Sequence, residues 1–515
     1  MASNNKQRHV VVVGGGAAGM SCAATLANHP EKFKVTVLER ADVVGGQATS
    51  IPLDEKKYGA PWMNNGVQGG SQIFKHTFNF FEKYNHPPQE VSLQVAFGKG
   101  EQGFWTNVFP SKLVANYAKD IKRFGFFLKV IKWTMPILGL IPISIMLKVF
   151  FFSKDFGDKM VYPLIALFLG TGNQTANVPS AIVERLFDDP NMKLWDYDSN
   201  TLLPNLPTMV TFDNLHEFYN KWREDLESKG VSIRTRSEVQ IALSRSDRGV
   251  ELRVRDNSTG QTTDESFDEM VLCVLADDSL RILGRTATKR EKFVLGGAAF
   301  YDDITVTHSD KEYFRKHYET CFRSELCGKP QSEEQKRQIS FAKGQEASEG
   351  FRPMYYTYTY QSDPRKIEMS FNCSNYQHQL KDANSRSNDA YSPVYQTIFL
   401  DKRQKHLWTI GEIDESKIIK CNWWHQLGHR WQHYLRVVPG MIFLHGRNST
   451  FYAGSWTLVN MHELACVSGI AAAYHLGADY AKFDDFAQDF FSKYLMLSHG
   501  ILYSREERKR RQPEN

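Results

Sequence analysis

The first forty residues alternate between short apolar runs and an alanine-rich segment. Val10–Val13 and Val35–Leu38 are dominated by β-branched and apolar residues, and each predicts a buried strand. Met20–Leu26, between them, contains Ala and Leu and predicts a helix. Two buried strands joined through a helix are typical of a βαβ unit, so the chain is expected to begin with parallel strands.

A second group of predicted strands lies in the middle of the chain. Val231–Thr235, Val239–Leu243 and Val250–Val254 are short apolar or alternating runs, and the polar residues Asp247–Gly249 predict a hairpin turn. Met270–Leu275 is apolar throughout, which suits a parallel strand buried on both faces.

The later part of the chain mixes alternating strands with one long apolar helix. Met354–Tyr360, Val394–Leu400 and His406–Ile410 alternate with a period of two, which predicts a sheet with one face lining an apolar space. Thr450–Trp456 then leads into the alanine-rich segment Val459–Leu476, a predicted helix.

The region from His76 to about Leu202 is mostly aromatic and apolar and predicts an inserted helical lobe. Within it, Phe124–Phe152 is strongly apolar, but its longest uncharged stretch, Trp133–Leu147, contains Pro136 and Pro142. A membrane-spanning helix needs about 20 apolar residues. Two readings therefore stay open: a buried helical pair that roofs a substrate channel, or a patch that contacts one membrane leaflet.

Composition narrows the class of protein. With 515 residues and 42% hydrophobic residues the chain can bury extensive cores, and a formal net charge of +5 is small for this length. Much of that excess lies in Arg505–Arg511, which is expected to be a solvated terminus, with contact to anionic lipid or nucleic acid as the alternative. No nucleic-acid partner is expected.

The seven cysteines are odd in number and form no C-x-x-C pair. This indicates a reducing compartment and argues against a zinc site or a disulfide framework. Met1–Arg8 is short and polar and does not resemble a secretory signal. The expected location is intracellular, either cytoplasmic or peripheral to a membrane.

A glycine motif connects the first strand to the first helix. Gly14, Gly16 and Gly19 follow the Gly-x-Gly-x-x-Gly pattern, and Glu39 stands twenty residues beyond Gly19 at the end of the second strand. In such a unit the first glycine permits a tight turn, the second lets the backbone approach a pyrophosphate, and the third allows close helix packing. The acid binds the ribose hydroxyls, so we expect a dinucleotide here.

Two other glycine clusters provide a comparison. Gly98, Gly100 and Gly103 match the same pattern but precede aromatic residues and a proline, not a helix, so a simple turn is expected. Asn65–Gly70 is a glycine-rich loop whose backbone could approach a flat ring, or an ordinary cluster of turns.

The lobes are expected to be interleaved along the chain, because no linker or internal repeat separates them. We predict an α/β fold with a discontinuous Rossmann-like dinucleotide-binding domain and an α+β substrate domain. The first comprises residues 1–75, 205–300 and 440–515, and the second comprises residues 76–204 and 301–439.

Histidines and tyrosines supply candidate chemistry. His425, His429 and His433 are spaced four residues apart and would share one face of a helix, where they could bind metal or act as bases. Adjacent tryptophans favour a packed helix, so no metal is expected and His429 is the candidate acid or base. Among Tyr355, Tyr356 and Tyr358, Tyr356 is the candidate for lining the pocket.

The chain resembles the superfamily of FAD-dependent amine oxidases and phytoene desaturases in four places along nearly its whole length. The first is the N-terminal glycine motif, followed by Glu39-Arg40 and Gly45-Gly46. The others are Gly230–Val239, the apolar strand after Phe267-Asp268, and Phe451–Ser455 with Glu463–Gly469. This resemblance implies non-covalent FAD. The residues expected to contact it are Gly14, Gly16, Ala18, Gly19, Glu39, Arg40, Gly45, Gly46, Gln47, Val239, Gly454, Ser455 and His462.

The chain also departs from the family pattern. Ser455 stands where members usually carry an acid, and Gln47 replaces a common arginine. His462 falls where small residues often let a helix approach the flavin, and the resemblance suggests that a cation there would stabilise reduced flavin. The aromatic cage that binds amines has no clear counterpart, so the likeness to amine oxidases concerns the fold and not the substrate.

The expected function is oxidation or desaturation of a hydrophobic small molecule, such as a lipid, terpenoid or polyketide-like metabolite, by hydride transfer to FAD. Oxygen or a quinone would accept the electrons. A redox-neutral double-bond isomerase acting on a polyunsaturated fatty acid or polyene is the first alternative. A non-catalytic flavin-binding protein at a membrane surface is the second.

Overall fold

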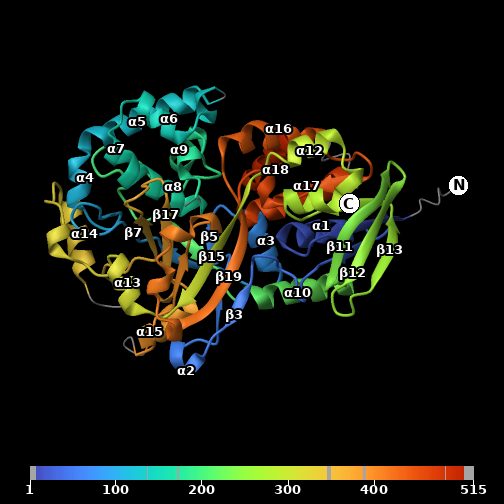
Figure 1. Ribbon diagram of the computed structural model, residues 1–515, viewed down its shortest axis with the longest axis horizontal. Helices are drawn as coiled ribbons and strands as arrows, with labels where there is room; N and C mark the ends of the chain where they lie inside the picture. The colour runs from blue at the N-terminus through green and yellow to red at the C-terminus, as the bar shows by residue number, and fades with distance from the viewer. Residues whose placement is uncertain are drawn as a thin grey trace.

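The computed structural model describes residues 7–135, 137–170, 173–344, 350–386, 390–481 and 483–503. Figure 1 shows two lobes side by side, one built on a parallel sheet and the other on a larger mixed sheet with a group of helices beside it. The chain crosses between the lobes several times. The predicted α/β architecture with interleaved lobes is confirmed, whereas the domain boundaries at individual residues stay a prediction.

A five-stranded parallel sheet forms the core of one lobe, in the order β10-β2-β1-β14-β20. All its pairings are parallel, with Val10 opposite Val35 and Val11 opposite Met270. The sheet thus gathers strands from the beginning, the middle and the end of the chain. Its members are β1 (Arg8–Val13), β2 (Phe33–Leu38), β10 (Ser232–Arg234), β14 (Glu269–Leu272) and β20 (Thr450–Tyr452).

Alternate side chains of β1 enter different cores. Val10 and Val12 belong to a core with helices α1 and α17, while Val11 and Val13 belong to a core with a three-stranded antiparallel sheet. The apolar run of β1 is therefore buried on both faces, as its sequence predicts. The covering elements are α1 (Ala17–Ala27), α10 (Leu215–Ser228), α17 (His462–Leu476) and α18 (Asp485–His499) on one side, and β11 (Ser237–Ser246), β12 (Gly249–Asp256), β13 (Thr262–Phe267), α11 (Ala276–Leu283) and α12 (Lys289–Leu295) on the other.

A seven-stranded mixed sheet forms the second lobe, in the order β19-β15-β18-β17-β16-β7-β8. The predicted strands near residues 355 and 395 are confirmed as β16 and β18. The sheet comprises β7 (Val95–Phe97), β8 (Trp105–Thr106), β15 (Phe300–His308), β16 (Tyr355–Thr359), β17 (Ile367–Asn372), β18 (Tyr395–Ile398) and β19 (Ile418–Leu427).

Helices between residues 112 and 188 form the helical part of the second lobe (Figure 1). The apolar segment Phe124–Phe152 is divided between α5 (Ala118–Trp133) and α6 (Ile143–Val149), and Pro142 stands at the N-cap of α6. No helix in the described residues is long and apolar enough to cross a membrane. The remaining helices here are α4 (Lys112–Asn116), α7 (Lys154–Phe156), α8 (Tyr162–Leu169) and α9 (Ser180–Asp188).

Smaller elements complete the fold. Two short sheets pair β3 (Ser50–Pro52) with β4 (Trp62–Asn64), and β5 (Gly69–Ser71) and β6 (Gln89–Ser92) with β9 (Thr208–Thr211). Gly98 and Gly100 have φ of +61° and +70° in a turn, which confirms that the second glycine pattern does not open a helix. The other helices are α2 (Glu55–Tyr58), α3 (Lys75–Lys83), α13 (Lys311–His317), α14 (Glu333–Lys343), α15 (His378–Arg386) and α16 (Val438–Gly440).

Two local predictions are wrong. His406–Ile410 was expected as a strand, but Lys402–Leu407 forms a 3-10 helix. The segment around His425 was expected as a helix, but it forms β19, which pairs with β15 along nine register positions. In both cases pairing with distant residues outweighs the local pattern. The seven cysteines form no disulfide, and Arg505–Arg511 lies outside the described residues.

Candidate functional site

The glycine turn after β1 has two tightly packed positions and one open position. Gly14 adopts φ of +104°, and a Cβ there would lie 2.7 Å from the Cys273 carbonyl oxygen. A Cβ at Gly19 would collide with the Gly14 carbonyl oxygen. At Gly16, in contrast, the nearest atom to an added Cβ is the Gly46 Cα at 3.8 Å. Protein packing therefore requires Gly14 and Gly19, whereas Gly16 leaves its backbone accessible, as a bound pyrophosphate needs.

The N-terminus of α1 carries no side-chain cap. Gly16 is the N-cap residue in an extended conformation, the first turn contains no acid, and Ala18 lies within that turn. The first amides of a helix have no partner within the helix, and the helix dipole favours an anion beside them. These residues fit the pyrophosphate of a dinucleotide.

Glu39 stands at the end of β2, buried beside this turn. One carboxylate oxygen accepts from the Gly15 amide at 2.7 Å and the other accepts from the Ala41 amide at 2.8 Å. Each oxygen retains further acceptor capacity, so the carboxylate can still receive ribose hydroxyls. Its neighbour Arg40 is exposed and lies 3.7 Å from Asp278 in α11.

A second glycine pair lies against the turn. The Gly45 amide donates to the Gly15 carbonyl at 2.9 Å, and Gly45 and Gly46 have φ of +118° and +60°. Gln47 follows this pair and is exposed, and a Cβ at Gly66 would collide with its carbonyl oxygen. The loop at Asn65–Gly70 therefore approaches, backbone to backbone, the segment that follows Gly45 and Gly46.

Val239 lies in β11, which begins beside the end of β2. The Ser237 amide donates to the Glu39 carbonyl at 2.8 Å, and the Val239 side chain is buried in the core. The side chain of Val239 is thus used in packing, and a contact between its backbone and the cofactor, which the resemblance implies, stays a prediction.

The C-terminal motif reaches the same region through β20 and α17. The Gly454 amide donates to the Ser468 hydroxyl at 2.8 Å, and Gly454 has φ of +146°. The Ser455 hydroxyl donates to the Asn460 side chain at 2.8 Å. Gly454 is held by α17, while Ser455 provides a neutral polar group where the family usually has a charge.

His462 joins three helices from a buried position. Its Nδ1 hydrogen-bonds with the Thr77 hydroxyl of α3 at 3.0 Å, and its Nε2 with the Tyr219 hydroxyl of α10 at 2.7 Å. Burial lowers its pKa to about 4, which disfavours the protonated imidazole. The contacts thus make His462 a link between α3, α10 and α17, and its role beside the flavin stays a prediction.

The three histidines that were expected on one helix face are separated. His425 lies on β19, His429 lies in the loop after it, and His433 lies in the helical segment that follows. His425 hydrogen-bonds with Asp302 and Asp277, each at 2.6 Å. No group of three or more His, Cys, Asp or Glu in the described residues is arranged to hold a metal ion.

His429 is fully buried and hydrogen-bonds with the Tyr434 hydroxyl at 2.8 Å. Burial, together with the neighbouring His433, lowers the pKa of His429 to about 3. An imidazole with this pKa is neutral across the physiological range. The structure gives no support for His429 as an acid or base.

Tyr356 is fully buried in the core that lies between the mixed sheet and α13. Its ring packs against Phe314 and Tyr318, and its hydroxyl donates to the Pro353 carbonyl at 2.9 Å. Its neighbour Tyr355 points to the opposite face and packs against Tyr376. These contacts make Tyr356 a packing residue of the sheet, and its place in a substrate pocket stays a prediction.

A buried polar network, missed from the sequence, joins the glycine-rich loop to the mixed sheet. Gln68 hydrogen-bonds with Gln396 of β18, and Gln396 donates to Asn65 at 2.8 Å and to Thr307 at 3.0 Å. Gln377 donates to Gln68 at 2.9 Å. The network fixes the loop where the two lobes meet. The glycines of the loop signal its location, but no local pattern pairs residue 68 with residue 396.

Asp303 is a second group that sequence reasoning missed. It lies on β15 opposite Trp424 of β19 and accepts from the Asn173 side chain at 2.7 Å. Burial raises the pKa of Asp303 to about 8. A carboxyl group with this pKa is mostly protonated at pH 7 and can donate a hydrogen bond.

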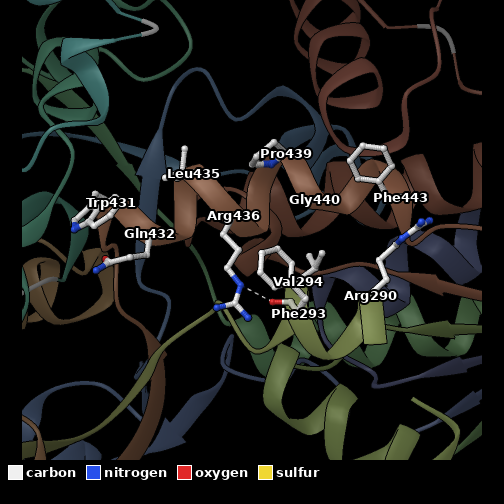
Figure 2. A pocket seen from close by; sticks show the side chains of 10 residues that line it. All are labelled: Arg290, Phe293, Val294, Trp431, Gln432, Leu435, Arg436, Pro439, Gly440 and Phe443. Atoms are coloured by element: carbon white, nitrogen blue, oxygen red, sulfur yellow. Dashed lines mark hydrogen bonds between the residues drawn. The ribbon is translucent and has the colours of Figure 1, made fainter. Parts of the chain in front are cut away.

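A cavity of about 660 Å³ lies elsewhere, between α12 and the helical segment that contains α16 (Figure 2). Phe293, Leu435 and Phe443 line it together with Arg290 and Arg436. None of these residues belongs to the dinucleotide-binding turn, so this groove is separate from the candidate cofactor site.

The N-terminal part of the chain matches a known type of domain. Residues 12–84 match a family model described as an NAD(P)-binding Rossmann-like domain. Over 128 residues the chain is 30% identical to the FAD-dependent oxidoreductase dbaF of Emericella nidulans. That match spans 23% of this chain and 25% of the relative's length, so it covers only a part of either protein.

Solved structures resemble most of the chain. A fatty acid isomerase from P. acnes has a TM-score of 0.58 at 16% identity, covering 92% of this chain and 100% of its own. A putrescine oxidase bound to putrescine has a TM-score of 0.57 at 11% identity, and the match covers 92% of this chain and 99% of the oxidase. At these identities the likeness shows the fold. The predicted Rossmann-like domain and the fold shared with amine oxidases are confirmed.

Proposed function

We propose that the protein is an FAD-dependent oxidoreductase that oxidises or desaturates a hydrophobic small molecule. The observation that carries this proposal is the turn at Gly14–Gly19 with its open Gly16, the uncapped N-terminus of α1, and the carboxylate of Glu39. The partial match to an FAD-dependent oxidoreductase supports the same cofactor and reaction class.

The chain's own residues would hold and orient the cofactor. The first amides of α1 and the Gly16 backbone would bind the pyrophosphate, and Glu39 would accept from the ribose. When bound, FAD supplies the group that accepts hydride or electrons. The network of Gln68 and Gln396 fixes the loop between the lobes, and this rigidity would set how a substrate approaches.

The composition of the second lobe favours an apolar substrate. Aromatic and aliphatic side chains dominate this lobe, and Trp105, Phe127 and Phe156 among them are packed in its core. A binding space bounded by such elements would be lined by apolar groups and would take lipid-like or polycyclic molecules by removing apolar area from water. Oxygen or a quinone would then take electrons from the reduced protein.

A redox-neutral isomerase is the second candidate. It is favoured by the fold shared with a fatty acid isomerase over the whole length of that protein. In this case hydride would leave one carbon of the substrate and return to another, so that no external acceptor is consumed.

Anaerobic mixing of the FAD-loaded protein with linoleic acid, a carotenoid or a polycyclic phenol separates the candidates. Lasting loss of flavin colour with an oxidised product supports the oxidoreductase. A product of unchanged mass without lasting bleaching supports the isomerase. If the protein holds FAD but neither bleaches nor converts any hydrophobic probe, a non-catalytic flavin-binding protein is favoured. FAD-free protein is the matched control.

A further inference from the structure

The outer side of α5 and α6 exposes large apolar side chains. The inner side of α5 is already filled, because Phe124, Phe127 and Ile131 are buried in the core of the lobe. On the outer side, Trp133 is 87% exposed, Phe151 84%, Ile137 75% and Phe126 62%. Soluble surfaces rarely gather such residues without a partner.

Basic residues surround these apolar side chains. Lys122 and Lys129 of α5 and Lys148 of α6 are exposed, and Lys132 forms an ion pair with Asp188. Apolar and aromatic residues interleaved with lysines are typical of segments that lie in the interface of an anionic bilayer. Lysines near such a surface are attracted by its negative potential.

The groove of Figure 2 is a second place where apolar and basic side chains meet. In Figure 1, α5 and α6 lie at the upper left, and α12 and α16 lie at the top near the centre. The groove combines apolar Leu435 and Phe443, both about half exposed, with Arg290 and Arg436. Figure 2 shows Leu435 and Pro439 pointing outward from their helix. The groove thus repeats the combination of residues found on α5 and α6.

We propose that the exposed side of α5 and α6 docks on an anionic phospholipid bilayer, with Trp133 and Phe151 inserted among the lipid headgroups. Aromatic side chains favour this interfacial layer. The association would be peripheral, since no helix in the described residues can span the bilayer. A second copy of this chain is a poorer fit, because a symmetric contact would bring Lys129 and Lys148 close to their own equivalents.

Co-sedimentation of the full chain with vesicles tests this proposal. The probes are vesicles of phosphatidylcholine alone and of phosphatidylcholine mixed with phosphatidylserine. Wild type is expected to sediment with the mixed vesicles and much less with the neutral ones. The double variant W133S/F151S should bind at least about tenfold more weakly, because it removes apolar area from the contact. The affinity of the double variant K129E/K148E for the mixed vesicles should fall roughly fivefold or more for each lysine replaced.

Matched controls come from β19, where Trp423 and Lys420 are also exposed but lie in another part of the fold. W423S and K420E should bind like wild type, and all variants should keep the wild-type circular dichroism and flavin content. Four results would overturn the proposal. In the first, wild type does not bind the mixed vesicles, and in the second, W133S/F151S binds them as well as wild type does. In the third, binding is lost only when residues 504–515 are deleted. In the fourth, the protein is a dimer in solution and W133S/F151S dissociates it.

Discussion

Gly469 of α17 lies directly against Ala18 of α1, where an added Cβ would collide with the Ala18 carbonyl oxygen. Next to this contact, the Ser21 hydroxyl of α1 donates to the Cys466 carbonyl of α17 at 3.0 Å. Helix α1, near the start of the chain, and helix α17, near its end, thus touch backbone to backbone behind the dinucleotide-binding turn. The C-terminal motif holds the N-terminal one in place.

Gly469→Ala should destabilise the protein by about 1–3 kcal/mol, because the colliding atoms belong to the backbone and cannot rotate away. Urea unfolding of the FAD-free protein measures this change. Gly411→Ala is the control, since a Cβ there meets nothing within 4 Å. It should shift stability by less than about 0.5 kcal/mol. Equal midpoints for the two variants would contradict the close contact of the helices.

Gly16→Ala and Gly19→Ala should fail in different ways. Ala at position 16 meets no protein atom closer than 3.8 Å, so the fold should persist while FAD affinity falls at least about tenfold, or about 1.4 kcal/mol. Ala at position 19 collides with the Gly14 carbonyl oxygen and should impair folding itself. Titration of FAD into each refolded variant, with circular dichroism, separates these outcomes. Normal FAD affinity of Gly16→Ala would show that no ligand approaches this backbone.

Glu39→Ala should reduce the retention of FAD and should also lower the stability of the FAD-free protein. Without the carboxylate, the Gly15 and Ala41 amides lose their acceptors, and the unpaired Gly15 amide, which is buried, costs about 1–3 kcal/mol. Glu39→Gln keeps one oxygen acceptor and should lose less stability. Comparing FAD occupancy and unfolding midpoints for both variants checks this order. Unchanged occupancy in Glu39→Ala would count against the ribose role.

Asp303 should make stability fall as pH rises. Burial raises its pKa to about 8, above its unfolded value of about 3.9, so the folded state holds an extra proton between these values. Its stabilising contribution is complete below about pH 4 and is lost as pH rises through about 8. Asp303→Asn mimics the protonated form and should flatten the pH dependence of Tm. Asp247→Asn, in an exposed turn, should leave the pH dependence of Tm unchanged. If the curves of Tm against pH for wild type and Asp303→Asn run parallel, Asp303 is not protonated in the folded protein.

His425 should add a second, smaller dependence on pH. Partial burial opposes its protonation, but the hydrogen bonds and charges of Asp277 and Asp302 outweigh burial and raise its pKa. Its contribution is therefore complete below the unfolded value of about 6.5 and is lost as pH rises through the higher folded pKa. Each of the two partly exposed ion pairs, His425 with Asp277 and His425 with Asp302, contributes about 0.2–1 kcal/mol to the free energy of unfolding.

The measurement for His425 is the difference in urea midpoint between wild type and His425→Gln across this pH range. The difference should be largest at acidic pH and shrink above the folded pKa, while His406→Gln, at an exposed position, should show no such trend. A constant difference would mean that the two aspartates do not hold a protonated imidazole.

Local patterns determined which parts of this fold were predictable. The turn at Gly14–Gly19 and the buried strand Val10–Val13 follow from spacing within a few residues, and both are confirmed. His425 and His429 were misplaced because a spacing of four also fits a helix, whereas the pairing of β19 with residues about 120 positions earlier decides the structure. Nothing near Tyr356 in the sequence tells which face of its strand α13 covers.

The buried groups depend on similar long-range contacts. Burial beside Thr77 and Tyr219, hundreds of residues away, lowers the pKa of His462. The pKa of Asp303 is raised by burial beside Asn173 and β19, which are also distant in the sequence. The glycine turn was thus predictable from local spacing, whereas the surroundings of His462 and Asp303 were not.

The flavin content of the purified protein tests the central claim most directly. The absorption spectrum should show the bands of oxidised flavin, and the supernatant after denaturation should contain one FAD per chain. A colourless protein that releases no flavin, and that takes up no FAD when it is refolded with an excess of the cofactor, would contradict the account.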